Sequence, residues 1–267
     1  MKWRPIAGIV LRQLYLLRGS PVRVYPMVTW VAIDIVLWGF ITRYLNSVSG
    51  SGMNFVPTLL GAVLLWDFCT RIMQGVSTAF LEDVWSRNFL NLFSSPLSIA
   101  EYISGLVITS VLTSIVGLIT MLILATWVFH LEFFSLGLPL AAFLLVLFVF
   151  GITLGILGSA VVLRLGPASE WLLWPLPALL SPFAAVFYPL ATLPPWMRAI
   201  AHALPPSYVF EGMRSLLAGS AFPAGLLLQG TAIAAVELLL AALLYGRIYR
   251  HAVRTGLLAR YSAESAA

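Results

Sequence analysis

The chain has 267 residues, of which 61% are hydrophobic and only 9% are charged, and its formal net charge is +5 at pH 7. Soluble globular domains carry about 25% charged residues, and their surfaces are too polar to be built from this composition. The composition therefore excludes a soluble domain. It predicts an all-α integral membrane protein with lipid as its solvent.

The fifteen cationic residues are fourteen arginines and one lysine, Lys2. Because the phosphate-binding loop of ATPases needs a lysine after its glycines, we expect no such ATPase in this chain. The one cysteine, Cys69, lies in an apolar run, which excludes an internal disulfide and a cysteine-cluster metal site. We expect Cys69 to be a small buried side chain, and we expect no metal or cofactor in this chain.

Residues 1–22 predict an amphipathic helix that lies in a membrane interface. Apolar residues recur at steps of three and four, at Trp3, Ile6, Val10, Leu14 and Leu17. Arg12 and Arg18 interrupt the run before the core of a signal peptide can form, so no cleaved signal peptide is expected. The alternative is a plain extension of the first span.

Six segments are long and apolar enough to cross a bilayer, which takes about 20 residues. They are Tyr25–Leu45, Phe55–Leu81, Ala100–Phe129, Leu136–Leu163, Trp171–Leu193 and Ala224–Gly246. The fifth contains four prolines between positions 175 and 189, so we expect it to be kinked or broken. The predicted organisation is an interface helix over 1–22, a six-span domain over 23–247 and a basic tail over 248–267.

The cations predict how the chain is oriented. Eleven of them fall in the two tails and in the loops after the second and fourth spans, against Arg43, Arg198 and Arg214 on the other side. The positive-inside rule then places both termini in the cytoplasm, and we expect a multi-pass protein of the bacterial inner membrane. The net charge is explained by topology and by contact with lipid headgroups, so no nucleic-acid partner is expected.

Four charged residues fall well inside predicted spans, away from their ends: Asp34 in the first, Asp67 and Arg71 in the second, and Glu237 in the sixth. Asp67 and Arg71 are four residues apart and so share a helix face. A charge at bilayer depth is costly unless it is paired or faces water. These residues either line a polar substrate path or form an ion pair that locks the first two spans together. Glu237 either pairs across helices or is protonated.

Two functions make different demands on the residues inside the spans. A proton-coupled secondary carrier would use Asp34, Asp67 and Glu237 to relay protons. Three carboxylates on three different spans, without a histidine that faces inward, are few groups for such a relay. An intramembrane enzyme needs a polar cluster at one depth. All three histidines fall at span ends or outside the spans, so no catalytic residues are expected.

The fourth span carries a face of small residues, at Gly151, Gly155, Gly158 and Ser159. Such faces let two helices approach closely. We favour packing inside the chain over a contact between subunits.

Two stretches between spans have helical patterns. On the cytoplasmic side, Trp85, Phe89, Leu92 and Phe93 form an apolar stripe. Acids lie in the first turn and Pro96 at the end, which predicts a short helix over about 82–96. It either rests on lipid or docks a partner. On the outer side, proline pairs at 194–195 and 205–206 predict the starts of two short helices over about 194–218.

Together these stretches resemble the permease subunits of type 2 ATP-binding-cassette exporters. The cytoplasmic match lies in Glu82, Asp83, Trp85, Arg87 and Asn88, then Ser95, Pro96 and Leu97, then Glu101, Tyr102 and Gly105. The outer match lies in Leu193 to Trp196, Leu204 to Tyr208 and Glu211 to Arg214. The order and spacing of these motifs relative to six spans agree with the family.

The resemblance implies a half-transporter in which two permease copies, as a homodimer, associate with two copies of a separate ATPase that binds ATP and Mg²⁺. It implies coupling to that ATPase through Glu82, Asp83, Trp85, Arg87, Asn88 and Phe89. It implies re-entrant outer helices that carry Pro195, Trp196, Pro206, Tyr208, Glu211 and Arg214. The implied function is export of a hydrophobic, lipid-linked or glycan-type substrate or a drug. Tryptophans such as Trp30 either stack on cargo or anchor the chain at the membrane interface.

Overall fold

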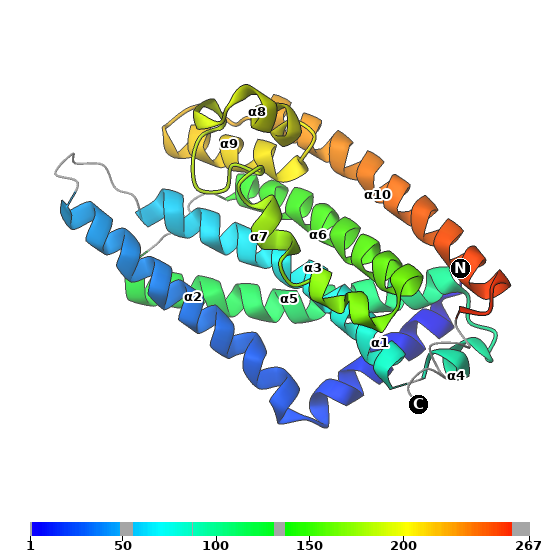
Figure 1. The fold of residues 1–267 in the computed structure, drawn as a ribbon. Coiled ribbons are helices and arrows are strands. Elements are labelled where there is room, and N and C mark those ends of the chain that lie inside the picture. Colours follow the sequence, from blue (N-terminus) through cyan, green and yellow to red (C-terminus); the bar gives the residue numbers. More distant parts are fainter. Residues whose placement is uncertain (1, 49–55, 87, 131–136, 258–267) are drawn as a thin grey trace.

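The computed structural model describes residues 2–48, 56–86, 88–130 and 137–257, and every regular element in these ranges is helical. Five helical stretches are long and apolar enough to cross a membrane. They are α2 (Pro21–Val48), the π-helical turn η1 (Val56–Leu60) continued by α3 (Gly61–Trp85), α5 (Ile99–Phe129), α6 (Leu138–Leu165) and α10 (Ala224–Arg254). They correspond to five of the six predicted spans and lie side by side as one bundle (Figure 1).

The fifth predicted span, Trp171–Leu193, is not a single helix. It contains the end of the 3₁₀ helix η3 (Pro167–Leu172), the short helix α7 (Leu176–Leu180) and the 3₁₀ turn η4 (Leu190–Thr192). The prolines explain the breaks, because each removes a backbone donor. This segment nevertheless carries the chain from the end of the bundle that holds α4 (Phe89–Phe93), called the α4 end, back to the end that holds α8 (Pro195–Ala201) and α9 (Pro205–Leu217) (Figure 1).

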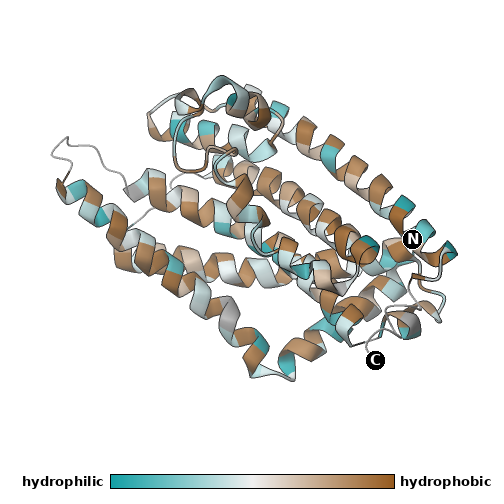
Figure 2. Ribbon diagram, viewed as in Figure 1, coloured by the Kyte–Doolittle hydropathy of each residue, from teal (hydrophilic) through white to brown (hydrophobic). Residues whose placement is uncertain are grey.

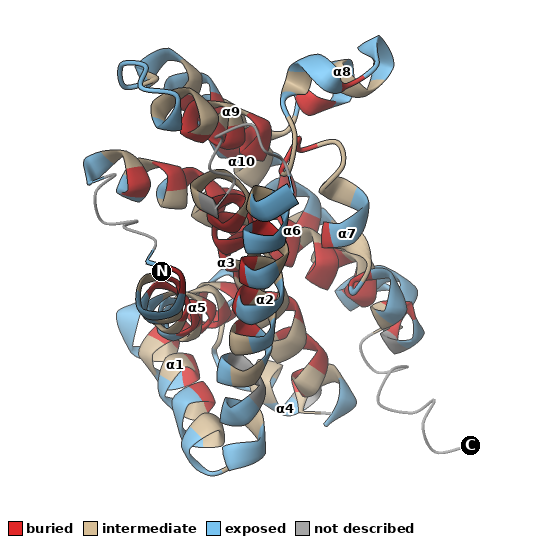
Figure 3. Cartoon of the chain, turned by 90° about the vertical axis from the view of Figure 1, so that its left-hand side faces the viewer, coloured by how far each residue is buried: buried red, intermediate tan, exposed pale blue. Residues whose placement is uncertain are grey.

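The helices α3 and α6 form the centre of the bundle. Of the 18 consecutive residues that are most apolar in each helix, 67% are buried in α3 and 61% in α6. The corresponding fractions are 19% in α2 and 22% in α10. Figure 3 shows buried residues concentrated on the inner helices and exposed residues along α2. The long helices are hydrophobic on most of their faces, the outer faces included (Figure 2), so their outward faces are suited to lipid or to another apolar protein surface.

The glycines of α6 explain how closely it packs against α3. A Cβ atom at Gly155 would lie 2.7 Å from Cβ of Val76, and one at Gly151 would lie 2.7 Å from the carbonyl oxygen of Cys69. The small-residue face therefore serves packing within the chain, as predicted. Cys69 is buried there, with 1% of its surface exposed.

The N-terminal helix α1 (Trp3–Arg18) is separate from α2 and covers the first turns of α5. Ile6, Ile9 and Gln13 are its buried residues, whereas Trp3 and Leu14 of the predicted stripe are exposed. The contact is close, because a Cβ at Gly105 of α5 would lie 2.6 Å from Cβ of Ile9. At the other end of the chain, α10 continues as a helix past Gly246 to Arg254, into the predicted tail.

Replacing Gly155 with alanine is expected to destabilise the protein. The added Cβ overlaps Val76, and overpacking of this kind costs about 1–3 kcal/mol. Gly246 is the matched control, because nothing lies within 4 Å of its Cβ position. There the change to alanine should be neutral or stabilising by up to about 1 kcal/mol. Thermal unfolding of the two variants in detergent measures the difference, and equal midpoints would contradict the packing argument.

Candidate functional site

A cavity of about 630 Å³ lies at membrane depth between α2, α3, α5 and the segment that leads into α7. Its walls carry three charged residues, Asp34, Asp67 and Arg71. Five polar side chains and two tryptophans join them: Thr70, Gln74, Thr78, Thr113, Ser114, Trp30 and Trp174. The cavity therefore gathers three of the four charges that the sequence places inside spans.

The helical period of α3 explains why its polar residues face this cavity. Asp67, Arg71, Gln74 and Thr78 are spaced three and four residues apart and form one stripe. Arg71 donates from Nη2 to Oδ1 of Asp67 at 3.1 Å and from Nε to the other carboxylate oxygen. Gln74 and Thr78 were not singled out from the sequence, although their spacing from Arg71 is a signal that could have identified them.

Asp34 reaches the same cavity from α2 and is half-buried. An ion pair in this region joins Asp67 and Arg71 within α3. The positive charge of Arg71 also attracts Asp34, which lies on the neighbouring helix α2.

Glu237 lies elsewhere, in a cavity of about 330 Å³ between α6, α7 and α10. Apart from Thr153, the other residues of this cavity are apolar. The Oε2 atom of Glu237 is buried without a hydrogen-bond partner in the part of the chain that the structure describes. Glu237 is thus separated from the cluster around Asp34 and does not share a cavity with it.

At the α4 end of the bundle, a buried carboxylate fastens three helices together. Asp83, in the last turn of α3, is fully buried. Arg12 of α1 donates to both of its oxygens, with 2.9 Å between Nη1 and Oδ2, and the Tyr102 hydroxyl of α5 donates to Oδ2 at 2.7 Å. The hydrogen bonds to Asp83 raise the pKa of Arg12 above its usual value. We call these three residues the Asp83 lock.

Two further acids at this end also bind groups of the same chain. Glu82 pairs with Arg23 of α2 at 2.7 Å. Glu101 accepts a hydrogen bond from the backbone N–H of Lys2 at 2.6 Å and forms a capping box with Ser98 at the start of α5. The acids at 82 and 83, expected to face an ATPase, are therefore occupied mainly in holding α1 and α2 against the bundle.

The helix predicted over about 82–96 is shorter in the structure. The acids and Trp85 belong to α3, and only α4 (Phe89–Phe93) follows as a separate helix. Phe89 is buried against the rings of Phe80 and Tyr102. Trp85 is 50% exposed, and the backbone N–H of Asn88 donates to the carbonyl of Asp83 at 3.0 Å. Arg87 lies outside the described residues.

At the opposite end, α8 begins at Pro195 and α9 at Pro205, so that Pro206 lies in the first turn of α9. Trp196 on α8 is 61% exposed. The Tyr208 hydroxyl donates to the carbonyl of His202 at 2.9 Å and so ties α9 to the turn after α8.

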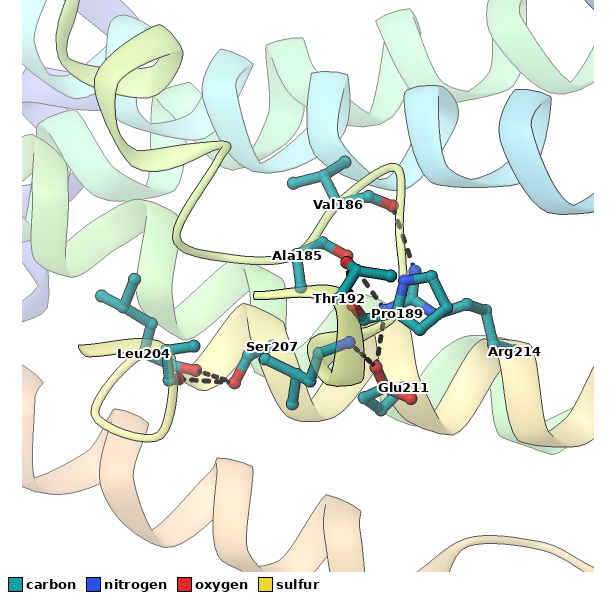
Figure 4. A network of polar contacts seen from close by, with 10 residues as sticks. Ala185, Val186, Pro189, Thr192, Leu204, Ser207, Glu211 and Arg214 are labelled. Carbon is teal, nitrogen blue, oxygen red and sulfur yellow. Dashed lines mark hydrogen bonds and ion pairs between the residues drawn. The ribbon is translucent and has the colours of Figure 1, made fainter. Parts of the chain in front are cut away.

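Glu211 and Arg214 of α9 hold the irregular segment that replaces the fifth span (Figure 4). Arg214 donates to the carbonyls of Ala185 at 2.9 Å and Val186 at 3.3 Å, and to Glu211 at 3.2 Å. Glu211 also accepts the N–H of Leu190 at 2.5 Å. Ala185 has a positive φ of 51°, a strained conformation that needs such support. Burial lowers the pKa of Arg214.

The five long apolar helices define a multi-pass membrane protein. The family model of the ABC-2 type transporter matches residues 20–218. The chain therefore belongs to the ABC-2 type transporter family and is a type 2 permease subunit, as the resemblance predicted. A search of curated proteins gave no match.

Replacing Arg12 with glutamine is expected to destabilise the protein by about 3 kcal/mol. The change leaves a fully buried carboxylate without its charge partner, and the value is at the low end because the Arg12 side chain is 27% exposed. Arg23→Gln is the control. It breaks a more exposed pair, which is worth about 1 kcal/mol or less. Thermal unfolding compares them, and an equal loss would contradict a special role for the Asp83 lock.

Replacing Arg214 with methionine is expected to loosen residues 185–190 without unfolding the bundle. The variant loses charged hydrogen bonds to two carbonyls, each worth about 1.5–3 kcal/mol. Hydrogen–deuterium exchange should rise roughly tenfold or more in this segment. Arg254→Met, at an exposed position in the last turn of α10, should leave it unchanged. Unaltered exchange in Arg214→Met would refute the assignment.

Proposed function

We propose that the chain is the membrane permease subunit of an ATP-driven exporter and that its charged cavity is part of the substrate path. The observation that carries this proposal is the cluster of Asp34, Asp67 and Arg71 around one cavity in a member of a transporter family. Charged groups are costly at bilayer depth, and those that face a cavity there are typical of substrate and ion paths. The cargo class is a hydrophobic, lipid-linked or glycan-type compound or a drug.

A separate ATPase chain supplies the energy and binds ATP and Mg²⁺. Its absence from this chain follows from the single lysine, Lys2, which cannot complete a phosphate-binding loop. We propose two ATPase copies and a second copy of this permease. The outward sides of α2 and α10 are apolar and exposed. They support a dimer because a second copy of the permease could pack against either of these uncovered helix faces.

The ATPase docks at the α4 end, beside Trp85 and Asn88, with Glu82, Arg87 and Phe89 in the same stretch. Trp85 supports this, because a half-exposed tryptophan at the end of a central helix is a typical anchor of a protein interface. A displacement of this end by the ATPase would move α1, α3 and α5 together, because Asp83 of α3 is bonded to Arg12 of α1 and to Tyr102 of α5.

The α4 end faces the cytoplasm of a bacterial cell, and α8 and α9 lie at the outer face of its inner membrane. The arginines support this orientation. Arg12, Arg23 and Arg164 lie at the α4 end, as do those in the last turns of α10. Positive residues favour the cytoplasmic side.

A proton-coupled carrier is the weaker proposal. It would relay protons between Asp34, Asp67 and Glu237, but Glu237 lies in a different cavity from the other two. A relay needs groups within hydrogen-bond reach or linked by water. The positions of these carboxylates therefore favour an energy source outside the chain.

Replacing Trp85 with alanine should reduce co-purification of the partner ATPase by tenfold or more, since anchor tryptophans contribute about 2 kcal/mol or more. Trp196→Ala is the matched control, because this tryptophan is similarly exposed, at 61%, but lies at the opposite end. Pull-down of the partner ATPase, with ATP-dependent transport in vesicles, gives the readout. Full co-purification with Trp85→Ala would contradict docking at the α4 end.

A further inference from the structure

The central cavity carries an excess of one formal negative charge, because two carboxylates, Asp34 and Asp67, share it with one cation, Arg71. Asp67 and Arg71 neutralise one another through two hydrogen bonds. Asp34 faces the same cavity, where it is attracted by Arg71, a cation that already pairs with Asp67. A carboxylate at this depth is unfavourable unless a positive charge or water offsets it. The cavity is therefore complementary to a monovalent cation.

Two tryptophans border the same carboxylate. Trp30 lies one turn before Asp34 on α2 and so on the same face of that helix, and Trp174 lines the cavity from the irregular segment. The two residues are 61% and 53% exposed, so they are not buried in the hydrophobic core. The face of a tryptophan attracts ammonium and other organic cations. A carboxylate beside two such rings is a suitable site for them.

Two hydroxyl groups of the cavity wall are used by hydrogen bonds within their own helices. Thr70 donates to the carbonyl of Trp66 at 2.9 Å, and Thr113 donates to the carbonyls of Thr109 and Ser110. These donors are satisfied by their own helices. The one guanidinium, on Arg71, is held by Asp67. Gln74, Thr78 and Ser114 also line the cavity, so the preference for a cation rests on the excess negative charge and on the two aromatic rings.

We propose that this cavity binds an amphiphilic organic cation, with its charged group against Asp34 and the rings of Trp30 and Trp174. The inference rests on the proposed function, since it names the cargo class of that substrate path. The volume of about 630 Å³ lies within the range of small-molecule pockets, roughly 300–1,000 Å³. The outer side of α2 is apolar and exposed, so a ligand dissolved in the bilayer has access.

Equilibrium dialysis of radiolabelled tetraphenylphosphonium against the purified full-length chain in detergent tests the proposal. Saturable binding is expected. Asp34→Asn should weaken it about tenfold or more, because a charged contact is lost, and Asp34→Glu should keep it within about threefold. Trp174→Leu should weaken it about three- to tenfold. Trp127→Leu is the matched control and should not, because this tryptophan lies outside the cavity.

Tetraphenylborate, which has the same shape and the opposite charge, should not compete for the site. Equal competition by tetraphenylborate, or equal affinity of Asp34→Asn and the unaltered protein, would overturn the proposal. If Asp34→Asn does not fold, the affinities of Asp34→Glu and Trp174→Leu for tetraphenylphosphonium are compared instead. Equal affinity of these two variants would overturn the proposal.

The test separates this inference from the proposed function. If the chain assembles with its ATPase and transports another cargo but does not bind tetraphenylphosphonium, the inference is wrong and the proposed function stands. If binding depends on Asp34 but no ATPase assembles with the chain, the inference stands and the proposed function is wrong.

Discussion

The close contact between α3 and α6 is the constraint on which the rest of the bundle depends. Gly151, Gly155 and Gly158 of α6 leave no room for side chains and bring the two backbones together. The face of α3 that meets them carries Cys69, Ile72, Val76 and Ser77. By helical geometry, the opposite face of α3 is the stripe that contains Asp67, Arg71, Gln74 and Thr78. Close packing on one side of α3 thus turns its polar side toward α2 and α5, where the cavity lies.

Features that repeat within one helix could be predicted from the sequence. The apolar runs gave five of the six spans to within a few residues at most ends, and the glycine face of α6 was interpreted correctly as internal packing. The pairing of Asp67 with Arg71 follows from their spacing of four residues. The prolines predicted that the fifth span is broken, but not that it consists of several short turns.

Contacts between helices could not be predicted in this way, because periodicity carries no information about which helices become neighbours. Arg12 and Asp83 are 71 residues apart in the chain, and nothing in either local pattern links them. The partners of Arg214 are mainly backbone carbonyls, which every residue has. The acids at 82 and 83 share the composition of an exposed amphipathic helix, and only the packing of α1 and α2 shows that they bind cations of this chain.

The irregular segment between α6 and α8 connects the regions that these contacts define. It starts at Pro167, at the α4 end, carries Trp174 in the wall of the cavity, and is held near Ala185 and Leu190 by α9. Non-helical backbone at membrane depth persists only where protein or water satisfies its polar groups. Arg214 and Glu211 satisfy several of them here. A long helix resists bending along its whole hydrogen-bond ladder, whereas this segment is held by a few side-chain contacts. We therefore expect movements between the two ends of the bundle to change the cavity first at Trp174.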